Sequence, residues 1–391
     1  MKKWFIFVQI ILLFSLFSNV GFATESDSVV SANEAENIAQ VYASNKSFEW
    51  ENATYKVLTK LYDYDDSLLG YYVSVYEGDK EVGYVVVSAR EDLAPVLEAG
   101  NHGSQTYRLL PEINKGNKIY YLGAMQYNYA KNKNELEQRV NDKKARLLIQ
   151  LEKEGKKGTD QYNKLKDKKI TPVKKDINSF KAAWKQYKSK VSSSRSTFSA
   201  EATYKELDVP LIGQKLSSNP NNACGPTTGA MIANYYKNRG YNIYGTANYG
   251  NSHQKFIDHL KVDMGTDALG TSTTEYNNGM IDHFGHTNQW PYYDGFPAEG
   301  NFTWYKERID HNEPVAFYID LVDDGGYSWT YHWVAGKGYD VSSYSEFVFN
   351  NPGNVIDTNG DGTTDAPDEV WLLWTNNDQD MYMVWHGFSY Y

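Results

Sequence analysis

Residues 222–236 read NACGPTTGAMIANYY, in which a lone cysteine is followed by small residues and then by a helical apolar pattern. The pattern indicates a helix buried in a core, with the thiol of Cys224 at its N-terminus. Unpaired N–H groups and the helix dipole favour a thiolate there, and the thiolate is the nucleophilic form of cysteine. Pro226 fits the first turn, where its missing N–H costs little. The stretch therefore predicts a reactive cysteine, and the alternative is an inert buried thiol.

The composition narrows the class of protein. The chain has 391 residues and 41% of them are apolar, which is enough for roughly two or three packed domains. Its single cysteine excludes an internal disulfide and a multi-thiolate metal site. The net charge of −10 gives no general support for binding nucleic acid. We therefore expect a globular monomer with no nucleic-acid partner.

The N-terminus has the pattern of a signal peptide over residues 1–23. Met1-Lys2-Lys3 precedes an apolar run over residues 4–17, and small residues at Gly21 and Ala23 suit signal peptidase. The run is about 14 residues, shorter than the roughly 20 that span a bilayer. The sequence therefore predicts a secreted, extracellular protein with no membrane association after cleavage.

Charge divides the rest of the chain into three zones. Residues 25–130 hold 8 basic and 16 acidic residues, residues 131–190 hold 19 and 8, and residues 205–391 hold 9 and 24. We expect the basic zone to be either a solvated helical surface or an electrostatic bridge between acidic domains, a bridge that salt would weaken. The predicted domains are an α+β domain (24–118), a basic helical connector (119–191), a polar linker (192–204) and a C-terminal domain (205–391).

Local patterns in the first two zones predict particular elements. Ser31 and Glu34 form a capping-box pattern before a helix of about 12 residues. Two aromatic and β-branched runs, 70–76 and 82–88, flank a turn and indicate a β-hairpin. Further helices are expected over about 120–154 and 177–191, where apolar residues recur at helical spacing.

A reactive cysteine needs a base that also protonates the leaving amine, and histidine suits this role near neutral pH. Of the eight histidines, His332 stands out because it opens a strand-like aromatic run that ends in a glycine turn at Gly338. The next strand-like run ends at Asn350 and Asn351, so an amide arrives where it could orient the imidazole. The hypothesis is a Cys-His-Asn order with Asn351 as the third member and Asn350 as the alternative. A packed strand histidine is the other interpretation of His332.

Gln214 lies ten residues before Cys224. It is the candidate second donor to an oxyanion, the backbone N–H of Cys224 being the first. The alternative is an ordinary surface amide.

These motifs resemble the papain-like peptidases related to the leader peptidases of bacteriocin exporters. The resemblance covers residues 205–391 and rests on Gln214, the Cys224-Gly225-Pro226-Thr227 block, His332 and Asn351-Pro352. It implies a bacterial cysteine peptidase with a papain-like α+β domain, a peptide or protein substrate and no organic cofactor. The family usually has Asp-Pro where this chain has Asn351-Pro352, a departure compatible with activity because papain itself uses an asparagine.

The N-terminal α+β unit, with GYVVVSA at residues 83–89, resembles the propeptides of streptopain-type secreted cysteine peptidases. That resemblance implies a precursor whose own pro-region acts as an intramolecular inhibitor.

Residues 357–368 read DTNGDGTTDAPD and predict a calcium loop. Oxygen ligands recur at alternate positions and a glycine at position 6 allows the sharp turn. The candidate ligands are Asp357, Asn359, Asp361, Thr363 through its carbonyl, Asp365 and Asp368. We expect a structural calcium ion there, and the alternative is a metal-free acidic turn.

The resulting hypothesis is a secreted, zymogen-like cysteine peptidase stabilised by calcium. Two other functions stay open: an inactive peptide- or glycan-binding module on the same fold, and a cysteine amidase that acts on peptidoglycan. The sequence does not give the cleavage preference, the substrate or the maturation site.

Overall fold

The structure is a computed structural model. It describes residues 30–44, 46, 50, 52–101, 106–123, 125, 127–153, 155, 157–158, 160–167, 177–192, 204–267, 270–291, 293–295, 301–319, 332–342, 345–353, 368–374 and 381–388. The predicted signal peptide, most of the polar linker and all of the predicted calcium loop except Asp368 lie outside these residues. None of the helices described has both the length and the apolar composition needed to cross a bilayer.

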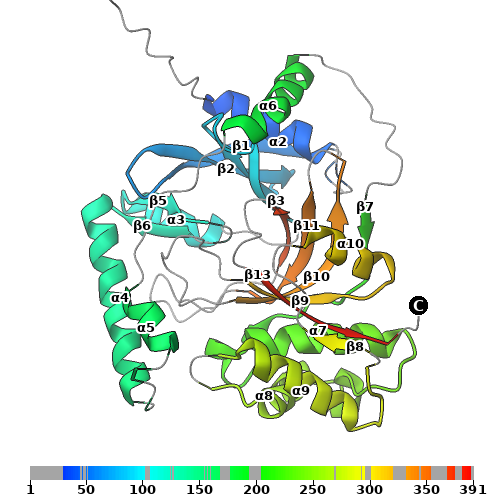
Figure 1. Cartoon of the computed structure of the whole chain (residues 1–391). Coiled ribbons are helices and arrows are strands. Elements are labelled where there is room, and N and C mark those ends of the chain that lie inside the picture. The colour runs from blue at the N-terminus through cyan, green and yellow to red at the C-terminus, as the bar shows by residue number, and fades with distance from the viewer. Residues whose placement is uncertain are drawn as a thin grey trace, which may run out of the picture.

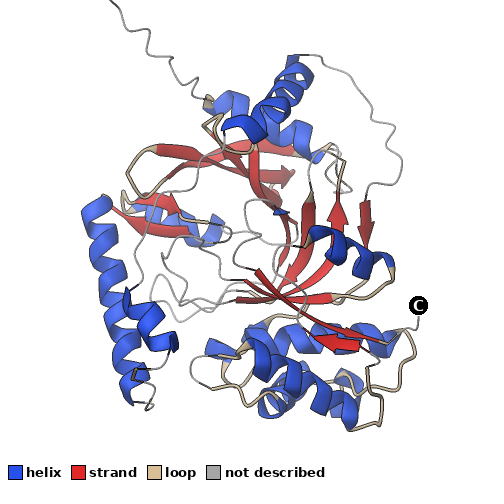
Figure 2. Ribbon diagram, in the orientation of Figure 1, coloured by secondary structure: helices blue, strands red, loops and turns tan. Residues whose placement is uncertain are grey.

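One mixed sheet runs through both halves of the chain (Figures 1 and 2). Its strand order is β6-β5-β1-β2-β3-β4-β12-β11-β10-β9-β13-β8, with β7 paired to β10. The N-terminal half supplies the strands from β6 to β4, and the C-terminal half supplies the others. Mixed helices and strands of this kind are compatible with a peptidase domain.

The elements of the first zone follow the predicted patterns. They are α2 (Ala32–Ala43), β1 (Thr54–Tyr62), β2 (Leu68–Glu77), β3 (Lys80–Ser88) and β4 (Val96–Asn101). The capping box is confirmed: Ser31 accepts from the Glu34 N–H, and Glu34 accepts from the Ser31 N–H at 2.8 Å. The hairpin is confirmed as β2–β3, which turns at Gly78 with a φ of +60°.

The predicted connector, residues 119–191, is less helical than expected because it begins with strands. The elements after β4 in the N-terminal half are α3 (Thr106–Asn114), β5 (Lys118–Tyr121), β6 (Tyr127–Ala130), α4 (Lys133–Lys153), α5 (Asp160–Asp167) and α6 (Ile177–Ser192). The helix predicted over 120–154 begins only at Lys133, because aromatic residues before it pair across β5 and β6, Tyr121 with Tyr127 and Ile119 with Tyr129. Helix α6 is confirmed, and it packs on α2.

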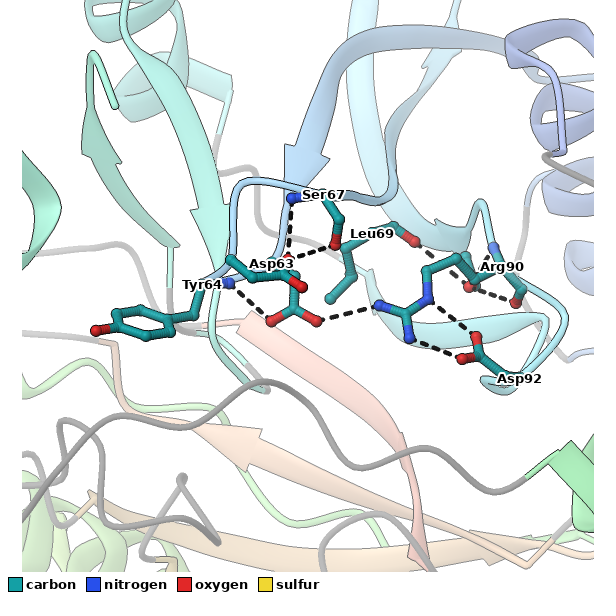
Figure 3. Close-up of polar contacts among 8 residues, drawn as sticks. Asp63, Tyr64, Ser67, Leu69, Arg90 and Asp92 are labelled. Atoms are coloured by element: carbon teal, nitrogen blue, oxygen red, sulfur yellow. Dashed lines mark hydrogen bonds and ion pairs between the residues drawn. The ribbon is translucent and has the colours of Figure 1, made fainter. Parts of the chain in front are cut away.

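An arginine fork joins two turns of the N-terminal sheet (Figure 3). Arg90, just after β3, donates from Nε and Nη2 to Asp92 at 2.9 and 2.7 Å, and from Nη1 to Asp63 at 3.2 Å. Asp63 follows β1, is buried and also accepts the Tyr64 N–H at 2.7 Å. Because the Asp63 carboxylate is paired with Arg90 and accepts a hydrogen bond, its charge can be buried. The same contacts fix the ends of β1 and β3.

The C-terminal half surrounds its strands with helices. The elements are β7 (Tyr204–Glu206), η1 (Gln214–Leu216), η2 (Pro220–Asn222), α7 (Cys224–Asn238), η3 (Thr246–Tyr249), α8 (His253–Asp263), α9 (Thr273–Gly285), β8 (Tyr293–Gly295), α10 (Phe302–Asp310), β9 (Val315–Ile319), β10 (His332–Asp340), β11 (Glu346–Asn351), β12 (Asp368–Leu373) and β13 (Met381–Gly387). Helix α7 packs on β9 and β10, and α8 and α9 pack on α7 (Figure 1).

The two halves meet at an antiparallel ladder between β4 and β12, in which Glu98 lies opposite Leu372 and Asn101 opposite Glu369. Trp371 and Leu373 of β12 share the apolar core of the N-terminal half. Buried Glu98 accepts from three tyrosine hydroxyls and from the Met125 N–H, and Met125 contacts the core of the C-terminal half. The junction is therefore made of main-chain pairing and apolar contact.

A buried ion pair also crosses the junction. Lys46, just after α2, donates to Asp340 of β10 at 2.7 Å and to Glu346 of β11. The Tyr42 hydroxyl donates to Glu346 at 3.0 Å. The described ion pairs of Lys188 with Glu91 and of Arg139 with Glu135, in contrast, lie within the N-terminal half.

Candidate active site

Helix α7 begins at Cys224, as its sequence predicts. Its first thirteen residues are buried, so the helix lies inside the C-terminal core and the thiol is at its N-terminal end. Gly225 is needed because a Cβ there would lie 2.7 Å from Thr271 Oγ1. Because Gly225 has no Cβ, the first turn of α7 can pack tightly against the segment that contains Thr271.

The thiol lies against the start of β10. The backbone N–H groups of Trp333, Gly225 and Cys224 itself each act to lower the pKa of the thiol. Trp333 is held in place by its indole N–H, which donates to Thr271 O at 2.8 Å, and by stacking on Tyr276 at 4.1 Å between ring centroids. Because Trp333 follows His332 directly, the structure brings the predicted nucleophile to the strand that carries the predicted base.

Burial changes the protonation expected for the thiol. It raises the pKa of Cys224 above its ordinary value, and the surrounding N–H groups and the positive charge of Lys261 offset this only in part. The helix N-terminus alone predicts the opposite direction. In the described conformation the sulfur is therefore a thiol at neutral pH.

His332, Asn351 and Asp368 form a hydrogen-bonded chain. His332 Nε2 lies 2.7 Å from Asn351 Oδ1, and Asn351 Nδ2 donates to Asp368 Oδ1 at 2.6 Å. Asn351 and Asp368 are opposite residues of the β11–β12 ladder, and all three side chains are buried. Asn350 instead donates to Val209 O at 2.7 Å, so Asn351 is the asparagine that contacts the histidine.

This chain determines which imidazole nitrogen carries the proton. An ionised carboxylate only accepts, so Asp368 must face the Asn351 amide nitrogen. Asn351 Oδ1 then faces His332 and also accepts the Gly353 N–H at 3.0 Å. His332 therefore donates from Nε2, and Nδ1 keeps its lone pair. Burial lowers the pKa of His332 to about 4, so the imidazole is neutral at physiological pH.

Gln214 is buried next to the same strand end. Its backbone N–H donates to Pro352 O at 2.8 Å, one residue beyond Asn351, and its side-chain amide donates to Pro220 O at 3.2 Å. Pro220 begins η2, which leads directly to Cys224. Gln214 Oε1 makes no hydrogen bond to the described residues. The amide thus lies between the chain before Cys224 and the chain after Asn351.

Two residues of the site were not assigned to it from the sequence. Asp368 was expected as a calcium ligand, whereas the structure shows it in contact with Asn351. This contact follows from the pairing of β11 with β12, which the sequence does not reveal. Lys261 of α8 donates to Asn219 O at 3.1 Å and to Asn222 Oδ1 at 2.5 Å, and its charge acts on the thiol. The position of Lys261 within its own helix does not predict that it lies near the loop before Cys224.

The remaining predicted calcium ligands, Asp357, Asn359, Asp361, Thr363 and Asp365, lie outside the described residues. The calcium site stays a prediction. Asp368 was its twelfth position.

Comparison with protein families gives one finding for this part of the chain. Residues 206–378 match the family described as Peptidase_C39 like family, which covers less than half of the chain and contains Gln214, Cys224, His332 and Asn351. The match supports a cysteine peptidase of the C39-like kind. No curated protein matches the chain.

Proposed function

We propose that the protein hydrolyses peptide bonds through Cys224, His332 and Asn351. The observation that supports this most directly is the orientation of His332, whose Nε2 is held by Asn351 while Nδ1 keeps its lone pair, beside the strand residue that contacts the thiol. An imidazole held in this way can take the thiol proton and later deliver it to a leaving amine.

In the proposed reaction, Cys224 Sγ bonds to the carbonyl carbon of the peptide while its proton passes to His332. The oxygen becomes an oxyanion, for which the Cys224 N–H and the Gln214 amide are the proposed donors. Collapse of this intermediate breaks the C–N bond, and the imidazolium protonates the amine. Water then hydrolyses the thioester with His332 as base, which regenerates the thiol.

We also propose that the described conformation is that of a precursor. Burial keeps the thiol and the imidazole neutral, whereas a working pair needs the proton to move from sulfur to nitrogen. The pairing of β4 with β12 puts Asn101 opposite Glu369, the residue next to Asp368. A pro-region paired so close to the site could restrain it. Secretion, a structural calcium ion and a monomeric state complete this proposal.

The mechanism is tested by comparing the protein with its Cys224→Ala variant on casein, after a protease has digested the pro-region away. Hydrolysis should be lost while the circular dichroism spectrum stays unchanged. Retained hydrolysis would refute the proposed nucleophile. Digestion of cell walls but not of casein would indicate an amidase instead.

A second measurement separates an enzyme from an inactive binding module. Iodoacetamide should label Cys224 faster after the pro-region has been digested away than before, because its removal opens the site. Sequencing the N-terminus of protein recovered from culture medium tests maturation, and a start at about residues 192–205 would support it.

A further inference from the structure

Three histidines and one aspartate meet at the ends of two neighbouring helices, apart from the residues proposed for catalysis. His259 and Asp263 are four residues apart in the last turns of α8. His283 lies in the last turn of α9, and His286 is its C-cap. Residues three or four apart share a helix face, so each helix contributes one pair. We call these four residues the α8–α9 cluster.

The α8–α9 cluster has the dimensions of a tetrahedral metal site. Asp263 Oδ2 lies 3.1 Å from His259 Nε2, 3.5 Å from His283 Nδ1 and 3.4 Å from His286 Nε2. Zinc–nitrogen and zinc–oxygen bonds of about 2.0–2.1 Å at tetrahedral angles separate neighbouring ligand atoms by about 3.4 Å. All four candidate ligand atoms lie within 4.8 Å of one another.

The hydrogen bond made by His283 Nε2 shows that the other ring nitrogen, Nδ1, carries a lone pair instead of a proton. Its Nε2 lies 2.9 Å from Tyr244 O, and a carbonyl only accepts, so Nε2 carries the proton. Nδ1 then faces Asp263 Oδ2, another lone-pair atom, and makes no hydrogen bond to the described residues. His283 is 0% exposed, so water cannot relieve this opposition. A cation bound between the two atoms would remove this opposition.

The outer contacts are those that metal-binding histidines usually make. A ligating histidine commonly donates its other ring N–H to a backbone carbonyl, as His283 does to Tyr244. The side chains of His259 and His286 are 29% and 40% exposed, which leaves a route for an ion from solvent.

We propose that the α8–α9 cluster binds one divalent transition-metal ion of the zinc type. Three imidazole nitrogens and one carboxylate oxygen are a donor set that suits zinc and its neighbours and is poor for calcium, which takes six to eight oxygens. The site is independent of the predicted calcium loop and does not rest on the proposed peptidase activity.

The ion would clamp α8 to α9. The helices already approach closely, since a Cβ on Gly279 of α9 would lie 2.5 Å from Met264 Cα, just after α8. Helix α8 in turn holds the loop before Cys224: Asp258 accepts from Ser217 Oγ at 2.7 Å, and Lys261 donates to Asn219 O. A metal that fixes α8 would therefore stabilise the loop that carries Gln214.

The test uses the full chain carrying Cys224→Ala, which removes the one thiol able to bind zinc. After treatment with a chelator and dialysis, the protein is titrated with zinc chloride in a calorimeter and separately with Co²⁺, whose visible absorption reports tetrahedral coordination. We expect one ion per chain, strong tetrahedral cobalt bands and a higher melting temperature with zinc.

Two variants distinguish the cluster from adventitious binding. His259→Ala with His286→Ala removes the two more exposed ligands and should weaken zinc binding by more than the roughly 100-fold loss that outer contacts alone can cause. His253→Ala, on the same helix but outside the cluster, should bind like the parent. Equal affinity in all three proteins, or a folded parent that binds no zinc, would overturn the proposal.

Discussion

Asn351 and Asp368 lie opposite each other in the β11–β12 ladder, and the Asn351 side-chain amide donates to Asp368 Oδ1 at 2.6 Å. This contact determines which end of Asn351 faces His332, and so which imidazole nitrogen is protonated. Asp368 thereby acts on the proposed base through a second residue, as a positioning residue.

Replacing Asp368 by Asn should reduce activity while preserving shape. An amide at position 368 can turn its NH₂ towards Asn351, which lets the Asn351 amide rotate and withdraw its oxygen from His332. We expect kcat/KM of the matured enzyme to fall by at least about tenfold, because a wrongly oriented imidazole is a poor base. Asp282→Asn, on the exposed face of α9, is the control and should leave kcat/KM unchanged. Equal rates for both variants would contradict the positioning role.

The free energy of unfolding should fall as the pH drops from 6.5 towards 4. The pKa of His332 is lowered from 6.5 to about 4 in the folded protein, so within this window only the unfolded chain binds the proton. The full shift corresponds to about 3 kcal/mol of stability present above this window and lost through it. Urea unfolding of the parent and of His332→Gln at about pH 7 and about pH 4.5 measures this. The parent should lose more stability than the variant, and parallel losses would exclude His332 as the source.

Removing the buried cation at the junction should destabilise the protein strongly. The side chain of Lys46 is only 3% exposed, so Lys46→Met leaves Asp340 and Glu346 buried without their cation and should cost about 3–5 kcal/mol. Lys306→Met is a matched control, since Lys306 also lies 2.7 Å from its aspartate, Asp310, but is 37% exposed. That variant should lose at most about 1 kcal/mol. Similar losses in both, measured by chemical denaturation, would show that burial is not decisive here.

High salt should not separate the two halves of the chain. If the basic helices bridged two acidic domains, raising the ionic strength would weaken the contact. The described junction instead consists of the β4–β12 ladder, a shared apolar core and a buried ion pair, which salt screens little. A protease site inserted between residues 192 and 204 allows the test. The cut halves should co-elute in gel filtration at low and at high salt, and separation only at high salt would favour the electrostatic bridge.

The sequence by itself determined the local elements whose signals are local. Ser31 and Glu34 define the start of α2, the turn at Gly78 defines the β2–β3 hairpin, and the small residues around Cys224 predict α7 with its thiol at the first position. Each depends on side chains a few residues apart, so propensity and capping suffice. Chain order also predicted that His332 and Asn351 would meet, because both lie at the ends of adjacent predicted strands.

Only the tertiary structure decided the relationships between distant segments. The pairing of β4 with β12 turns two expected domains into one sheet, and strand propensity cannot specify a partner. The β11–β12 ladder places Asp368 opposite Asn351. The packing of α8 on α9 brings together four residues that are scattered polar positions in the sequence. Burial of the thiol outweighs the helix N-terminus and raises its pKa, because desolvation depends on everything packed around Cys224 and not on its own helix alone.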